Sequence, residues 1–349
     1  MGRSKTTSAQ RSTGENVLAN LCPPTCIEKL EIKGYFAREL PQWMRTMSAF
    51  GSLRRMVLED YACCTQLPNG LGQLPFLDCF WIKRAPSVQC IGHEFLLPSL
   101  SDDYVGKDGT SGMTGSQNKR RQAHHIPGGA GVAFPKLVTL GFEGILGLTE
   151  WEWEQHIPAM PVLEMLRVHD CKLQCLPTGL AHHARQLREL RLINITHLVS
   201  IENLPSVVKL WPYNNPIIER ISNNPSLQWI DISSCPALKE LNGLPSLQSL
   251  GWWDLGAEAL PQYLRETKLN KLHVDCSPSL FKLIALQDES SEWGKIKHVQ
   301  QLKAYGKTSS EDKVDRHIYY TKEPYSFDVD LGKSTDSDEE EENELSEEE

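Results

Sequence analysis

The side chains best suited to chemistry in this chain are histidines and cysteines, but their spacing is not that of a metal site. His124-His125 and His182-His183 lack the cysteine or carboxylate neighbours that would complete a ligand set. The ten cysteines form neither a CxxC…CxxC nor a CxxC…HxxxH pattern, and they are too sparse for a disulfide scaffold. We therefore expect that the chain binds no metal. We also expect a cytoplasmic protein whose cysteines are reduced thiols.

Motifs that would hold a nucleotide or activate a nucleophile are missing from the sequence as well. There is no G-x-x-x-x-G-K-[ST] loop for phosphates, and the glycines of 106–115 neither follow a strand nor open a helix. No Gly-x-Ser-x-Gly turn occurs, and no Cys/His pair stands out. The sequence thus predicts no enzyme, no cofactor and no nucleotide.

The charge is confined to one end of the chain. Of the net charge of −9, ten carboxylates fall in residues 334–349, which contain no Lys or Arg. The rest is nearly neutral, so nothing in its charge favours nucleic-acid binding. No stretch is long and apolar enough to span a bilayer, and the polar N-terminus is no secretory signal.

A repeat of the form apolar-x-x-apolar-x-apolar sets the architecture. Apart from one gap of 60, successive repeats start 20 to 26 residues apart, which is the leucine-rich-repeat range. The repeats begin at Ile27, Leu53, Leu77, Leu137, Leu163, Leu187, Val207, Leu227, Leu247 and Leu269.

The spacing of apolar residues within each repeat predicts a short strand with one buried face. A single strand cannot bury that face alone, whereas stacked repeats share a continuous core. The predicted fold is an α/β leucine-rich-repeat solenoid, with a curved parallel β-sheet on the concave face and an irregular or short-helical convex side. Leu-Pro dipeptides fall on the return side of the repeats.

The segments outside the repeats complete the expected organisation. Residues 1–25 are a lead-in, 26–283 the solenoid, 284–332 a C-terminal cap and 333–349 a disordered acidic tail. A Gly/Ser-rich insertion at 98–133 explains the 60-residue gap, and we expect a mobile loop there. Within the cap, Ser291–Tyr305 suggests a helix and Tyr325–Leu331 a last strand.

With no catalytic residues found, the candidate site is a surface. Residues between the apolar anchors point onto the concave sheet, where exposed aromatic and arginine side chains are typical of protein-binding hot spots. An alternative to protein binding is that some of these rings fold over neighbouring side chains and only complete the surface of the sheet. The candidate protein-binding residues are Trp81, Arg167, Arg191, Trp211, Tyr213, Trp229 and Trp253.

Several separated stretches resemble one family. They are Glu15–Pro24, Leu30–Met44, Ala133–Leu137 with Glu150–Trp153, and Cys235–Leu241, and they resemble the C-terminal leucine-rich-repeat region of plant coiled-coil NB-LRR disease-resistance proteins. The resemblance covers roughly residues 15–300. It implies a cytoplasmic immune receptor whose repeats recognise a pathogen effector and restrain a nucleotide switch.

The sequence departs from that family in lacking the coiled-coil and nucleotide-binding (NB-ARC) domains. The resemblance therefore implies a fragment, a truncated gene product or an adaptor that acts on full-length receptors. Its expected partner is a protein: a pathogen effector, a host protein that the receptor guards, or an NB-LRR receptor. The alternative is a substrate-recruitment adaptor of the ubiquitin-ligase type, although residues 1–25 are short and polar for an F-box-like segment.

Overall fold

The structure, a computed structural model, describes residues 18, 20–45, 47–96, 131–308 and 316–332. The chain divides into two compact units, Met1–Glu189 and Leu190–Glu349, and each is described by itself. The expected tail at 333–349, and 98–130 of the expected insertion, lie outside the described residues.

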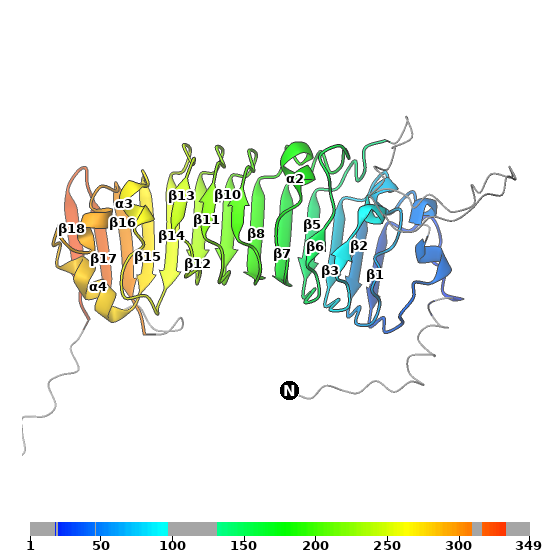
Figure 1. The fold of residues 1–349 in the computed structure, drawn as a ribbon, viewed down its shortest axis with the longest axis horizontal. Helices are drawn as coiled ribbons and strands as arrows, with labels where there is room; N and C mark the ends of the chain where they lie inside the picture. The colour runs from blue at the N-terminus through cyan, green and yellow to red at the C-terminus, as the bar shows by residue number, and fades with distance from the viewer. Residues whose placement is uncertain (1–17, 19, 46, 97–130, 309–315, 333–349) are drawn as a thin grey trace, which may run out of the picture. The chain divides into compact units, whose positions relative to one another are not determined.

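The first unit is built on a sheet of parallel strands, one for each repeat, drawn from blue to green in Figure 1. These strands are β1 (Lys29–Lys33), β2 (Arg55–Glu59), β3 (Cys79–Lys83), β5 (Thr139–Glu143) and β7 (Met165–Cys171). On the return side a second parallel pair forms, β4 (Cys90–Ile91) with β6 (Glu150–Trp151). The unit's helices are the short η1 (Gln42–Arg45), η2 (Met47–Ala49), η3 (Leu71–Gln73), η4 (His93–Phe95) and α2 (Thr178–His183).

The second unit continues the same design. Its main strands are β8 (Glu189–Ile195), β10 (Lys209–Tyr213), β12 (Trp229–Ser233), β14 (Ser249–Asp254), β15 (Lys271–Cys276), β16 (Gln301–Gly306), β17 (His317–Thr321) and β18 (Ser326–Asp330). The pairs from β10 to β16 are parallel, whereas β17 and β18 pair antiparallel at the end of the sheet. The return side carries β9 (Ser200–Glu202), β11 (Arg220–Ser222) and β13 (Glu240–Asn242), and the helices are α3 (Tyr263–Glu266), α4 (Pro278–Ala285) and α5 (Trp293–Ile296).

The apolar anchors of successive repeats stack in columns, as the repeat pattern predicts. In the first unit Leu140 pairs in register with Leu166, and in the second Leu210 pairs with Ile230; all are fully buried. Each buried aliphatic side chain contributes roughly 1.5–3 kcal/mol to the gross stability. The ten predicted repeat strands are all present, and the fold is a leucine-rich-repeat solenoid.

One detail of the sequence analysis is wrong. The helix expected over 291–305 is only α5, and residues 301–306 form β16, an eleventh repeat strand parallel to β15. Its anchors are Val299, Leu302 and Ala304, and the small side chain of Ala304 concealed the pattern. The return side also carries parallel strands of two or three residues, which are too short for periodicity to reveal.

Buried asparagines hold neighbouring repeats of the second unit together. Asn215 accepts a hydrogen bond from the backbone N–H of Ile195 (2.8 Å) and donates one to the carbonyl oxygen of Leu192 (2.9 Å). Asn224, in the same repeat, makes the equivalent pair of bonds on the return side with the backbone N–H of Leu204 and the carbonyl oxygen of Ile201. Both side chains are essentially inaccessible to water, so these bonds satisfy backbone groups that water cannot reach.

Candidate protein-binding surface

The predicted site residues all lie on one face of their sheet, which we call the outer face. It carries the residues that alternate with the buried anchors along each strand. Each of the seven is half-buried, so its side chain is partly covered by neighbours and partly open to solvent. They lie on β3 (Trp81), β7 (Arg167), β8 (Arg191), β10 (Trp211, Tyr213), β12 (Trp229) and β14 (Trp253).

In the first unit, Trp81 is the centre of a small cluster. Its ring lies over Gly141, the residue opposite it on β5, where a Cβ atom would overlap the indole. The guanidinium of Arg167 is 5.6 Å from the ring centre, and the ammonium of Lys83 is 5.3 Å from it. The absence of a side chain at Gly141 therefore makes room for a ring that has two cations within cation–π distance.

In the second unit, a chain of ring contacts begins at β8. The Arg191 guanidinium lies 4.5 Å from the centre of the Trp211 ring. Trp211 in turn packs edge-on against Trp229 at a centroid distance of 4.8 Å. Aromatic pairs in this geometry contribute about 0.5–1.5 kcal/mol beyond their buried area, so these rings are held in place.

Asp231 connects the next two rings. Its carboxylate accepts hydrogen bonds from the Tyr213 hydroxyl (3.3 Å) and from the Trp253 indole N–H (3.4 Å). Burial raises the pKa of Asp231 above its usual value, and these two hydrogen bonds only partly offset that effect. Burial, with the nearby carboxylate, also raises the pKa of Tyr213 to about 12.

The face continues onto β15 and β16 with residues that the sequence analysis did not single out. His273 lies 5.1 Å from the Trp253 ring and 5.3 Å from the Tyr305 ring, measured between centroids. Asp275 contacts His273 Nε2 at 2.9 Å and Lys307 Nζ at 2.5 Å. The repeat at Leu269 predicts the outer positions of His273 and Asp275, because both alternate with its anchors. Tyr305 could not be predicted, because it lies on β16, where a helix was expected.

Burial alone would raise the pKa of Asp275, which is only 3% exposed. The hydrogen bonds from His273 and Lys307 outweigh that effect, so the pKa lies below its ordinary value of 3.8. The two carboxylates of this surface therefore differ: Asp275 is stabilised in its charged form, whereas Asp231 is not. We call the outer-face residues of the second unit the aromatic face: Arg191, Trp211, Tyr213, Trp229, Asp231, Trp253, His273, Asp275 and Tyr305.

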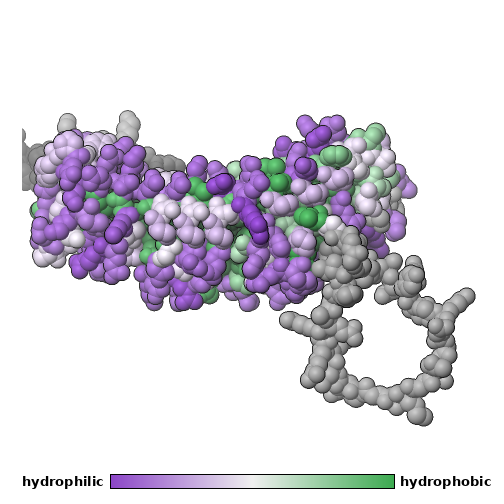
Figure 2. Space-filling model, turned by 90° about the horizontal axis from the view of Figure 1, so that it is seen from above, coloured by the Kyte–Doolittle hydropathy of each residue, from purple (hydrophilic) through white to green (hydrophobic). Residues whose placement is uncertain are grey.

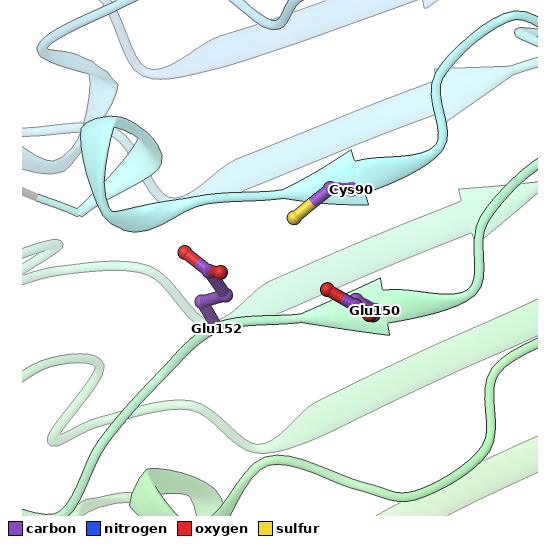
Figure 3. Close-up of side chains that lie close together, drawn as sticks. All are labelled: Cys90, Glu150 and Glu152. Carbon is purple, nitrogen blue, oxygen red and sulfur yellow. The ribbon is translucent and has the colours of Figure 1, made fainter. Parts of the chain in front are cut away.

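A separate group on the return side of the first unit has ligand types that metals use. The Cys90 thiol on β4 and the carboxylates of Glu150 on β6 and of Glu152, just after β6, lie together, with ligand atoms within 4.8 Å of one another (Figure 3). Burial and the carboxylates of Glu152, Glu150 and Glu94 raise the pKa of the Cys90 thiol to about 11. Because metals bind the thiolate, this environment works against metal binding.

Apolar side chains elsewhere on the surface are scattered. The side seen in Figure 2 is mainly hydrophilic, with hydrophobic residues visible as separate patches. Exposed apolar residues such as Phe76, Leu146 and Ile217 lie in different repeats. Among the described residues, no helix combines the length and apolar character needed to cross a bilayer. The aromatic face is therefore the more concentrated set of binding-type side chains.

Comparison with known proteins supports the repeat assignment at the N-terminal end. Residues 2–85, which contain β1, β2 and β3, match a family model described as R13L1/DRL21 LRRs, leucine-rich repeats of the plant resistance type. A search of curated proteins gave no match. The stacked parallel strands show a leucine-rich-repeat solenoid, and the match over residues 2–85 supports a protein-interaction module similar to the leucine-rich repeats of resistance proteins.

Proposed function

We propose that the chain acts in plant innate immunity by binding a protein through the aromatic face. The partner is a pathogen effector or host protein, or an NB-LRR receptor that the chain regulates. The observation that carries this proposal is the run of Arg191, Trp211 and Trp229 across three neighbouring strands, each half-buried and held by ring contacts. A few residues supply most of the binding energy at protein interfaces, and tryptophan, tyrosine and arginine are enriched among them.

Pre-organisation strengthens this argument. Binding loses less free energy when the side chains of a surface already have their bound positions. Tyr213 and Trp253 are fixed by Asp231, and Trp229 is fixed by Trp211.

The proposal locates the chain in the cytoplasm, and its cysteines support this. All ten cysteines are free thiols, among them the exposed Cys22, Cys26 and Cys175. Free thiols at exposed positions are typical of proteins in a reducing compartment. The same surface acts without a catalytic group, as leucine-rich-repeat scaffolds typically do.

The experiment is quantitative cross-linking in plant tissue with the tagged chain. Trp229→Ala combined with Trp253→Ala removes two anchors of the aromatic face, and we expect the cross-linked partner to fall by roughly tenfold or more. Phe76→Ala, which removes an exposed aromatic from the other unit, is the matched control and retains the partner. Circular dichroism must be unchanged in both variants.

Two results would overturn the proposal. If the double variant keeps its partner at the wild-type level, the aromatic face is not the binding surface. If the main cross-linked proteins are ubiquitin-ligase core subunits rather than immune components, the chain is a substrate-recruitment adaptor.

A further inference from the structure

The aromatic face carries a charge pattern that the proposed function does not use. At the outer positions of β10, β12, β14, β15 and β16 the carboxylates are Asp231 and Asp275, which are 9% and 3% exposed. Both are engaged by neighbours on the face itself: Asp231 by Tyr213 and Trp253, and Asp275 by His273 and Lys307. Neighbouring side chains therefore cover both carboxylates, and little of their negative charge is exposed to solvent.

The charges that remain exposed at these positions are lysines: Lys209, Lys271 and Lys303. Lys271 and Lys303 lie on the adjacent strands β15 and β16, two residues apart in register. A ligand that meets this end of the aromatic face therefore meets positive charge beside the rings of His273 and Tyr305. Charge complementarity favours an acidic ligand.

An acidic segment of the same chain follows β18 in the sequence. Residues 334–349 hold ten carboxylates and no cation, and they follow β18 by only a few residues. β18 is two strands from β16 and three from β15. At about 4.8 Å per strand, Lys303 and Lys271 are roughly 10 and 15 Å from β18. Sixteen residues can reach roughly 50 Å.

The local charges favour this direction for the segment. Asp328 and Asp330 are exposed on β18, on the outer face that also carries Lys303, so β18 itself repels the segment and the lysines beyond it attract the segment. The nearest outer-face strands with exposed lysines are β16 and β15. Tethering gives a segment of this length an effective concentration on the order of millimolar, which makes weak, exposed ion pairs sufficient.

We propose that residues 334–349 dock on the outer face of β15 and β16 through Lys271 and Lys303, and compete there with the protein partner of the aromatic face. The competition rests on the proposed function, whereas the docking itself does not. The contact is electrostatic and exposed, so it weakens as salt rises. An acidic partner would then have to displace the segment before it reaches Tyr305 and His273.

Zero-length carbodiimide cross-linking of the full-length chain tests the docking directly, because it joins carboxylates to lysines in contact. At low protein concentration and low salt, mass spectrometry should find the cross-links of residues 334–349 concentrated at Lys271 and Lys303. At 0.5 M salt the Debye length shortens to about 4 Å, so exposed ion pairs are screened and these cross-links should fall by roughly fivefold. Lys239, Lys268 and Lys322 are exposed lysines outside these strands and serve as internal controls.

A charge-reversal variant makes the result decisive. Lys271→Glu with Lys303→Glu should release the segment, which is measured as a gain in rotational freedom of a dye on the C-terminus. Lys239→Glu with Lys268→Glu is the matched control and should leave the dye unchanged. Cross-links spread evenly over Lys239, Lys268 and Lys322, or equal dye mobility in both variants, would overturn the proposal. Because neither readout involves a partner, failure here leaves the proposed function standing.

Discussion

The indole N–H of Trp253 on β14 donates a hydrogen bond to the carboxylate of Asp231 on β12, at 3.4 Å, directly above Gly251. A side chain at Gly251 would occupy the space of the carboxylate oxygen, because the position pairs in register with Asp231. The order of the aromatic face therefore depends on a residue with no side chain.

Gly251→Ala tests this dependence. The new methyl group must push Asp231 or Trp253 aside, and overpacking of this kind costs about 1–3 kcal/mol. We expect a lower melting temperature together with a change in tryptophan fluorescence. Gly256→Ala is the control, since its Cβ would meet Asp254 at an ordinary 3.6 Å. Equal melting temperatures for the two variants would show that Gly251 is not a packing constraint.

Asp275 gives a stability that depends on pH. Its folded-state pKa lies below 3.8, so the unfolded chain binds the proton more readily and the carboxylate stabilises the fold above that pH. Asp275→Asn should cost about 1.5–3 kcal/mol at pH 7, because His273 and Lys307 lose a charged acceptor. The difference from wild type should disappear as the pH falls below 3.8. Chemical denaturation across this range measures it, and a difference that persists in acid would contradict the assignment.

Asp231 should behave in the opposite way. Its folded-state pKa is raised, so the folded chain holds the proton more tightly, and stability from this group falls as the pH rises through its folded pKa. Asp231→Asn keeps an acceptor for Trp253 and Tyr213 while removing a buried charge. At pH 7 we expect unchanged or higher stability in the same denaturation assay. A loss as large as that of Asp275→Asn would show that the Asp231 charge is needed.

The buried amide of Asn215 is a fourth stability test. Asn215→Ala leaves the N–H of Ile195 and the carbonyl of Leu192 without their partner, at a cost of about 1–3 kcal/mol for a buried polar group. Asn270→Ala, at an exposed position, is the matched control. Hydrogen exchange should show faster exchange of the Ile195 amide in the Asn215 variant alone, and unchanged exchange would exclude a role for the amide.

The sequence predicts the main strands because each repeat places bulky residues at its anchors, as Leu137, Leu140 and Phe142 do before and within β5. It misses β16, since Ala304 is a small anchor. It also places Trp211, Trp229 and Trp253 on the outer face, because alternation along a strand depends only on position.

The sequence does not predict the links between these side chains. The shared contact of Tyr213 and Trp253 with Asp231 depends on how three strands align and on the space above Gly251. Such contacts join residues 18 and 22 positions apart in the sequence, and the repeat pattern does not predict which side chains meet at that distance. The opposite pKa directions of Asp231 and Asp275 likewise follow from neighbours on other elements.

Hydroxyl-radical footprinting of the chain with its cross-linked partner tests the central claim most directly, because it reports which aromatic side chains a partner covers. Our account predicts lower oxidation of Trp211, Trp229 and Tyr213 in the complex, with Phe76 and Tyr325 unchanged as exposed aromatics elsewhere. Protection of Phe76 or Tyr325, with the oxidation of Trp211 and Trp229 unaltered, would contradict it.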